Sequence, residues 1–281
     1  MRGQCFKVLH TLYKIFLEEL ILVLRSLTIL PGFDRNGQRE NFKEILLLPG
    51  ETVSIVGPTG SGKTALITDI ELLAQGDTAT RRWVLVNNEP PDDEIRYNPA
   101  AKPIAMITQN TKCFADVSVG EFLAIHARAR GITEKKVLEE TVRLANQFTG
   151  EKIHDGLKVT VLSGGQTRSL LIADAILIGA APIILLDEIE NAGIFKQEVM
   201  EIIQGSGKII IFVTHDPVIA LHTRKRIIME NGAVKKILQQ EEGEVLAAQS
   251  LIELDKKISE IREALRAGRV ITGKLAIADP A

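Results

Sequence analysis

Short apolar runs alternate with turns along most of this chain, and their spacing predicts its secondary structure. Two runs, at residues 183–188 and 208–215, contain consecutive apolar residues followed by polar side chains. Such runs are typical of central parallel strands that are buried on both faces of a sheet. Because ligands of open α/β sheets bind beyond the carboxyl ends of the strands, the polar ends are candidate site residues. The other runs that predict strands lie at 20–30, 45–48, 52–56, 83–86 and 104–108.

Apolar residues at helical spacing predict helices between these strands. The segment 117–148 stands out, because two helical patterns follow one another there without a strand between them, which predicts a helical insertion. Residues 88–103 contain proline and aspartate and predict an exposed loop. The Asn231-Gly232 pair predicts a hairpin turn. The remaining predicted helices lie at 64–74, 167–179 and 195–203.

Both ends of the chain depart from this alternation. Residues 4–20 predict an amphipathic helix that either packs on its own domain or docks on a membrane surface or a partner. Near the other end, a heptad pattern predicts a helix that either pairs with another chain or lies on the main domain. The heptad residues are Ala247, Leu251, Leu254, Ile258, Ile261 and Leu265. The expected parts are an N-terminal helix (1–20), a main domain (21–240, with a helical subdomain at about 110–162) and a C-terminal helical extension (241–281).

Composition narrows the class of protein. With 281 residues, of which 45% are hydrophobic and 25% charged, the chain has the composition of a globular protein. A formal net charge of −2 makes nucleic acid an unlikely partner. Charged residues interrupt the longest apolar stretch, 5–30, so we expect neither a transmembrane span nor a signal peptide. The cysteines, Cys5 and Cys113, form no disulfide or metal pattern, and a cytoplasmic location is expected.

A glycine-rich turn separates the predicted strand 52–56 from the predicted helix 64–74. Glycines let the backbone curl so that successive N–H groups surround phosphate oxygens at the positive end of the helix. In such a loop the lysine, here Lys63, reaches the β- and γ-phosphates, and the hydroxyl of Thr64 binds Mg²⁺. The order strand, loop, helix therefore predicts a nucleotide site. The loop reads Gly57-Pro58-Thr59-Gly60-Ser61-Gly62-Lys63-Thr64.

Polar residues follow three other predicted strands. Asp187 is suited to hold Mg²⁺, and Glu188, one residue further on, is suited to accept a proton from an attacking water. Adjacent acids often belong to a solvated loop, but the four apolar residues before this pair indicate a strand end. Gln109 and His215 end strands of their own.

Together these motifs resemble those of the ATP-binding cassette (ABC) ATPases, over about residues 21–236. The phosphate loop alone indicates only a P-loop NTPase. The resemblance becomes specific through Leu162-Ser163-Gly164-Gly165-Gln166, which precedes the strand ending in Asp187 by one helix. It implies an α/β fold with a mostly parallel central sheet, an antiparallel β subdomain and a helical insertion. It also implies ATP and Mg²⁺ as ligands and ATP hydrolysis as the activity.

The same resemblance implies a role for each strand-end residue. Asp187 becomes a Mg²⁺ ligand, and Glu188 becomes the general base that acts on water. Gln109 contacts Mg²⁺ or water and connects the core to the helical insertion. His215 donates a hydrogen bond to the γ-phosphate. Lys63 completes the predicted catalytic set.

Ser163, Gly164, Gly165 and Gln166 imply a dimer. In the family, the amides of this loop point at the γ-phosphate bound to the opposite subunit. A chain with one phosphate loop and one such signature therefore implies a head-to-tail homodimer around two ATP molecules. Phe33 lies about where the family places the aromatic residue that stacks on adenine, with Phe42 as a competitor.

The chain also departs from the family pattern. After Asp187-Glu188, many members have a D-loop with an aspartate that is missing from the segment 189–194 here. The first function that we expect is the nucleotide-binding subunit of a membrane transporter, which acts through a separate permease at the inner face of the membrane. The alternative is a soluble ATPase that drives conformational change in a protein or nucleic-acid complex, which the altered D-loop and the added terminal helices favour. A nucleotide sensor without hydrolysis is disfavoured, because Lys63, Glu188 and His215 are all present.

Overall fold

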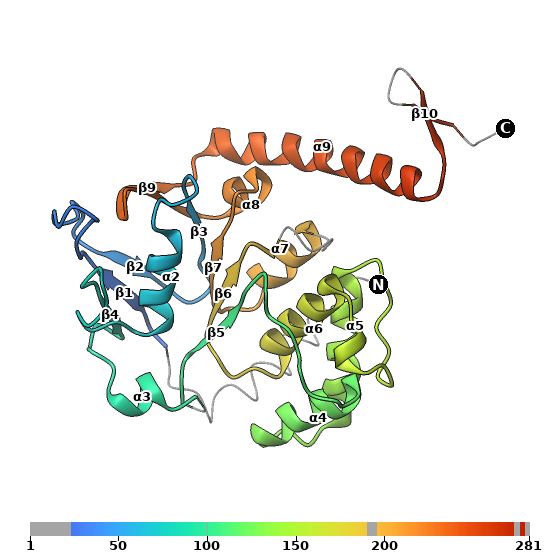
Figure 1. Cartoon of the computed structure of the whole chain (residues 1–281), viewed down its shortest axis with the longest axis horizontal. Helices are drawn as coiled ribbons and strands as arrows, with labels where there is room; N and C mark the ends of the chain where they lie inside the picture. The colour runs from blue at the N-terminus through green and yellow to red at the C-terminus, as the bar shows by residue number, and fades with distance from the viewer. Residues whose placement is uncertain (1–23, 100, 190–195, 273–275, 279–281) are drawn as a thin grey trace.

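The computed structural model describes residues 24–99, 101–189, 196–272 and 276–278 (Figure 1). The predicted N-terminal helix at 4–20 and most of the D-loop segment lie outside these residues.

The centre of the molecule is a six-stranded sheet with the order β5-β6-β7-β3-β8-β9. Its strand pairs are parallel except for β8 and β9, which form an antiparallel hairpin. Asn231 and Gly232 form the hairpin turn and have φ angles of 52° and 84°, the left-handed values that a tight two-residue turn requires. The predicted mostly parallel sheet is confirmed. Its strands are β3 (Thr52–Val56), β5 (Ile104–Ile107), β6 (Ile183–Asp187), β7 (Ile209–Val213), β8 (Lys225–Glu230) and β9 (Ala233–Gln239).

A second, three-stranded antiparallel sheet with the order β2-β1-β4 covers one side of the molecule. Its strands are β1 (Leu27–Leu30), β2 (Ile45–Leu47) and β4 (Trp83–Val86). Alternate residues of β1, Leu27 and Ile29, are fully buried. This sheet is the predicted antiparallel subdomain, so the predicted fold class is confirmed.

The two faces of the central sheet pack against different helices. Ile183 and Leu185 of β6 belong to a core formed with α2 (Lys63–Glu71) and the antiparallel sheet. Their neighbours Ile184 and Leu186 face the opposite way, into a core formed with the helical layer. Figure 1 shows α2 on one side of the central strands and α4, α5 and α6 on the other. The helical layer comprises α4 (Val119–Ala129), α5 (Lys135–Phe148), η1 (Val159–Val161), α6 (Gly164–Leu177), α7 (Lys196–Gln204) and α8 (Pro217–His222).

Two local predictions were wrong. The segment 88–103 contains a short helix, α3 (Asp93–Tyr97), which begins because Asp92 accepts a hydrogen bond from the backbone N–H of Ile95 at 2.8 Å. The helix after the signature begins at Gly164 rather than at 167, because Ser163 and Gln166 form a capping box. Apolar periodicity marks the buried part of a helix, whereas its first residue is set by the cap.

The C-terminal extension is not helical throughout. A helix of 25 residues, α9 (Glu242–Arg266), is followed by a hairpin of β10 (Val270–Thr272) and β11 (Ala276–Ala278). The start of α9 lies beside α8, and the rest extends past the central sheet (Figure 1). The heptad residues Leu254 and Leu265 are 53% and 58% exposed, so this face does not lie on the described main domain. Within the described ranges, every helix is too short or too polar to cross a bilayer.

Candidate functional site

The strand order brings the predicted strand-end residues to one edge of the central sheet. Neighbouring strands β5, β6, β7 and β3 are parallel, so their carboxyl ends lie on the same side. Gln109 follows β5, Asp187 and Glu188 end β6, His215 follows β7, and the phosphate loop follows β3. The acidic pair and the phosphate loop therefore flank His215 from the two strands next to it.

The phosphate loop has a shape that only glycine permits. Gly57 and Gly62 have φ angles of 155° and 102°. A Cβ atom on Gly57 would lie 2.5 Å from the carbonyl oxygen of Met229, and one on Gly62 would lie 2.7 Å from the Cα atom of Gly232. The loop thus packs against the end of the β8–β9 hairpin so closely that a side chain at either position would collide with it.

Lys63 belongs to this loop and is the first residue of α2. Its Nζ atom donates hydrogen bonds to the carbonyl oxygens of Gly57 and Pro58 at 2.8 and 3.1 Å. Burial lowers the pKa of Lys63, and the negative charges of Glu188 and then Asp187 act in the opposite direction. The ammonium group therefore lies within electrostatic reach of the acidic pair across the site.

The loop offers groups that suit phosphate oxygens. The Oγ atom of Ser61 is buried without a hydrogen-bond partner among the described residues. Thr64, next to Lys63, is exposed, and the space beside Gly60 is open. A buried hydroxyl, a lysine and a helix N-terminus that face one curved loop are donors suited to phosphate oxygens. Thr64 and Asp187 are oxygen ligands of the kind that Mg²⁺ prefers.

Glu188 is held in an unusual backbone conformation. Its φ angle is 49°, and its N–H donates a hydrogen bond to the carbonyl oxygen of Val213 at 2.9 Å. Left-handed backbone at a residue other than glycine costs of order 1 kcal/mol or more and is often found at functional sites. The Oε1 atom of Glu188 lies 3.7 Å from Nε2 of His215, and both side chains are partly exposed.

Gln109 is exposed at the end of β5. Its backbone carbonyl oxygen accepts a hydrogen bond from the guanidinium of Arg168 on α6, whose pKa is lowered by burial. Arg168 thus joins the Gln109 loop to the signature helix. The sequence analysis missed this contact, because an arginine among the other polar residues of α6 gives no signal of a bond to a distant backbone carbonyl.

The signature residues form the start of α6. The Oγ atom of Ser163 accepts from the N–H of Gln166 at 3.3 Å and donates to Oε2 of Glu151 at 2.6 Å. Ser163 and Gly164 are exposed, and Gly165 is half-buried. α6 and α2 pack on opposite faces of the sheet, so the signature and the phosphate loop begin helices on different sides of it.

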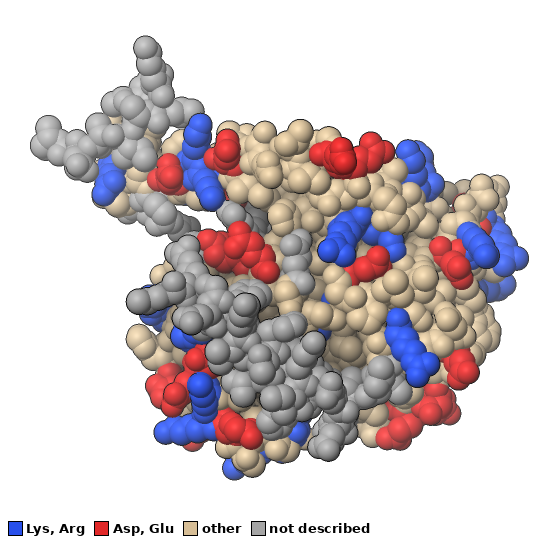
Figure 2. Space-filling model, turned by 180° about the vertical axis from the view of Figure 1, so that it is seen from behind, with Lys and Arg blue, Asp and Glu red and all other residues tan. Residues whose placement is uncertain are grey.

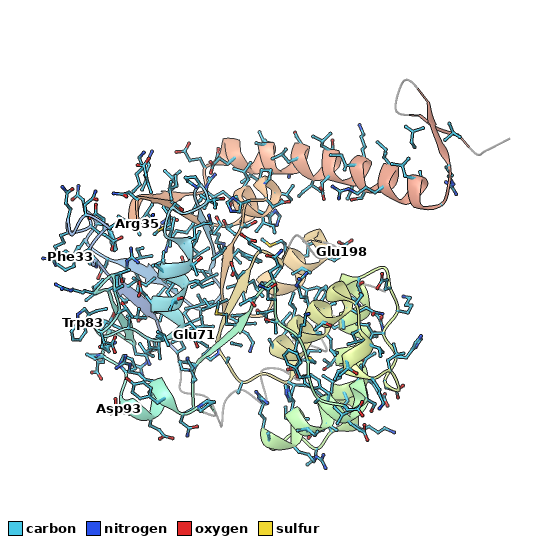
Figure 3. The ribbon with its side chains drawn as sticks, viewed as in Figure 1. Phe33, Arg35, Glu71, Trp83, Asp93 and Glu198 are labelled. Atoms are coloured by element: carbon cyan, nitrogen blue, oxygen red, sulfur yellow. The ribbon has the colours of Figure 1, made fainter. Side chains whose placement is uncertain are left out.

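Phe33, the predicted adenine-stacking residue, follows β1. Phe33 is half-buried, and the guanidinium of Arg81 lies 5.7 Å from the centre of its ring. Phe42 is also half-buried and packs against the core beneath the antiparallel sheet. In Figure 3, Phe33 and Arg35 lie at the end of the molecule formed by the antiparallel sheet.

The sequence profile of the ABC transporter family matches residues 44–191, more than half of the chain. The chain belongs to the ABC transporter family. It is 46% identical to an uncharacterized ABC transporter ATP-binding protein of Methanocaldococcus jannaschii, over 89% of this chain and 95% of that protein. It is 27% identical to a thiamine import ATP-binding protein of Brucella suis, over 68% of this chain and 79% of that protein.

Solved structures of this family have the same fold. A dimeric ATP-binding cassette in a post-hydrolysis state, bound to ADP and Pi, aligns with a TM-score of 0.57 and 25% identity, over 76% of this chain and 99% of that one. ATP hydrolysis is therefore the activity of this cassette. The predicted family, fold class and enzyme class are confirmed. The roles of single residues stay predictions.

Proposed function

We propose that this cassette binds and hydrolyses Mg²⁺-ATP as a head-to-tail homodimer and energises a membrane transporter through a separate permease. The observation that carries the proposal is the separation of two half-sites within one chain. The phosphate loop, Glu188 and His215 share one edge of the sheet, and the loop begins α2. The signature begins α6, which packs on the face of the sheet opposite to α2. In the proposal, the phosphate-loop half binds ATP and Mg²⁺, and the signature half supplies helix N–H groups to the γ-phosphate.

In the proposed site, residues 57–62 bind the phosphates through backbone N–H groups, and Lys63 neutralises the terminal phosphates. Thr64, Asp187 and Gln109 would hold Mg²⁺. The metal ion supplies charge neutralisation of the phosphates. Phe33 stacks on the adenine ring.

Hydrolysis needs a water that loses a proton as it attacks phosphorus. Glu188 lies at the sheet edge where its carboxylate can accept that proton. His215, 3.7 Å from Glu188, lies beside the attacked phosphate and donates a hydrogen bond to a γ-phosphate oxygen. The fixed backbone of Glu188 means that little reorganisation is needed when the proton moves.

The exposed signature supports a dimer. The N–H groups of Gly164 and Gly165 are at the free start of a helix of 14 residues, where an anion is favoured. In the proposed dimer this helix start meets the γ-phosphate held by the other subunit, so ATP joins the two chains. Hydrolysis removes that link.

A transporter role is supported by the relatives, which include an import ATP-binding protein of similar length. The proposed location is the cytoplasm, against the inner face of the membrane when the permease is bound. On the face drawn in Figure 2, the described lysines and arginines lie in small groups between acidic side chains rather than in one basic patch. This mixed surface gives no support to nucleic acid as the partner.

One observation favours the alternative, a soluble complex as the target. Helix α9 presents Leu254, Ile258 and Leu265, which are 39–58% exposed, on a helix that extends away from the main domain. Such a face suits a protein partner in solution.

The experiment that separates the two functions is purification of the tagged Glu188→Gln variant with ATP from the native membrane and from the cytosol. We expect an integral membrane protein to co-purify in a fixed ratio, and to be absent when Lys63→Ala replaces the trapped variant. Recovery of a soluble complex alone would favour the alternative function.

A further inference from the structure

A buried cluster of charged side chains lies behind the phosphate loop, outside the predicted site. Arg82 precedes β4, and its side chain is 0% exposed, as is that of Glu40, whereas Asp69 of α2 is 2% exposed. Nε and Nη2 of Arg82 donate to the two oxygens of Glu40 at 2.8 and 2.6 Å, and Nη1 donates to Oδ2 of Asp69 at 2.8 Å. Burial alone would lower the pKa of Arg82, but these hydrogen bonds and charges raise it above its usual value. The cluster is therefore ionic.

The cluster contacts the phosphate loop through the hairpin turn. Nη2 of Arg82 also donates to the carbonyl oxygen of Gly232 at 2.9 Å. Gly232 in turn donates its N–H to the carbonyl oxygen of Ser61 at 2.8 Å, and its Cα atom fills the space where Gly62 would carry a side chain. Arg82 thus fixes the turn, and the turn supports the phosphate loop.

The same cluster fixes the segment that carries Phe33. Oε2 of Glu40 accepts a hydrogen bond from the N–H of Gly32 at 2.9 Å, and the two residues also share a backbone hydrogen bond of 3.0 Å. Phe33 donates its N–H to the carbonyl oxygen of Thr80 at 2.7 Å, and the Thr80 hydroxyl donates to Asp69 at 2.7 Å. Both sides of the Phe33 position are therefore tied to the buried ions.

Glu40 also connects the Phe33 segment directly to the β8–β9 hairpin. Its second oxygen, Oε1, accepts a hydrogen bond from the N–H of Val234 at 2.7 Å, two residues after Gly232. Apolar residues of similar volume could stabilise a fold as well as a buried ion cluster does. They would not give directional bonds to three separate segments, which is what fixes one segment relative to another.

We propose that Arg82 is a positioning residue for ATP, which with Glu40 and Asp69 holds the phosphate loop and the Phe33 segment in the register that one nucleotide needs. The inference rests on the proposed nucleotide site. Two weak contacts made by one ligand add fully only when the protein holds them at the right separation. Loss of Arg82 therefore weakens the contribution of adenosine more than that of the phosphates.

The test compares the dissociation constants of ATP and inorganic tripolyphosphate by isothermal titration calorimetry. In Arg82→Lys one ammonium group replaces the guanidinium and cannot bond Glu40, Asp69 and Gly232 together. We expect the dissociation constant of ATP to rise by about tenfold or more, which is the size of effect that the loss of one charge-assisted hydrogen bond has. The dissociation constant of tripolyphosphate should rise far less. The matched control is Lys225→Met, a buried cation at the opposite end of β8 that pairs with Glu51 at 3.3 Å.

Glu40→Gln is the second variant, because it keeps the shape of the cluster and removes one charge. The deciding quantity is the ratio of the dissociation constants of ATP and tripolyphosphate. The proposal is overturned if folded Arg82→Lys and Glu40→Gln have the same ratio as the unmodified protein and Lys225→Met, even if both ligands bind more weakly. Lys63→Ala separates this failure from failure of the proposed site. If Lys63→Ala leaves the binding of both ligands unchanged, the site itself is wrong.

Discussion

His215 and Glu188 face each other at the carboxyl edge of the sheet, with Nε2 of the histidine 3.7 Å from Oε1 of the carboxylate. This separation is longer than a hydrogen bond, so the histidine and the carboxylate lie close together without a direct hydrogen bond between these two atoms. The two side chains come from adjacent parallel strands, and the N–H of Glu188 is bonded to Val213, two residues before His215. The proposed base and the proposed γ-phosphate ligand are thus fixed relative to one another by the backbone.

We predict that Glu188→Gln abolishes turnover but not ATP binding. The amide has nearly the same shape but cannot accept the proton of the water, and general-base catalysis is worth about 10²- to 10⁴-fold in rate. Phosphate release under single-turnover conditions measures the rate, and size-exclusion chromatography with ATP measures the dimer. We expect a stable dimer with ATP, and rapid hydrolysis by this variant would remove Glu188 from the role of base.

We predict that His215→Ala lowers the rate of hydrolysis by roughly 10²-fold, the cost of losing one aligned donor to a developing negative charge. The measurement is kcat at saturating ATP. His222→Ala is the matched control, because His222 is a half-buried histidine at the end of α8. Equal losses in the two variants would mean that His215 matters to the fold and not to the reaction.

The sequence predicted the strand-end residues well because a buried parallel strand leaves little freedom. Four fully buried residues from Ile183 to Leu186 form the strand, and they fix Asp187 at the sheet edge. The Asn231-Gly232 turn was equally predictable, since its backbone angles suit few other residues.

The Arg82 cluster was not predictable from the sequence in the same way. Glu40, Asp69 and Arg82 lie far apart along the chain, and nothing in the residues beside each of them indicates that the three charges meet. Their burial follows from the packing of α2, β4 and the hairpin turn against one another. A pairing that arises only from tertiary structure leaves no period in the sequence.

We predict that two inactive variants restore activity when mixed. Lys63→Ala damages the phosphate loop, and Gly164→Asp places a negative charge at the signature. An aspartate fits at Gly164, because a Cβ atom there would approach no described neighbour closer than the Arg168 guanidinium at 4.0 Å. In a mixed head-to-tail dimer one of the two sites has both halves intact, so about a quarter of full activity should return.

The control for mixing is a chain that carries both substitutions. It should stay inactive when it is mixed with Lys63→Ala or with Gly164→Asp, because no site in such a dimer has both halves intact. ATPase activity after co-incubation, as a function of the ratio of the two variants, gives the measurement. If the mixture stays inactive although each variant is folded and the chains exchange, the signature does not act across a dimer.

We predict that Lys208 makes stability depend on pH. This lysine precedes β7, where Nζ donates to the carbonyl oxygens of Gly179 and Ala181 at 2.8 and 2.7 Å. Burial lowers its pKa from 10.5 to about 7, the charge of Arg130 adds to this shift, and that of Asp174 opposes it. Between these two pKa values the unfolded chain binds more protons at this position than the native chain does.

The free energy of unfolding should therefore rise with pH from about 7 towards 10.5, and the contribution of the neutral amine should be lost as the pH falls through about 7. Urea unfolding at a series of pH values measures this slope in the unmodified protein and in Lys208→Met, which should lack this part of the rise. Lys158→Met is the control, because that lysine side chain is 56% exposed. A slope that is the same in Lys208→Met as in the other two proteins would show that Lys208 keeps its proton in the native state.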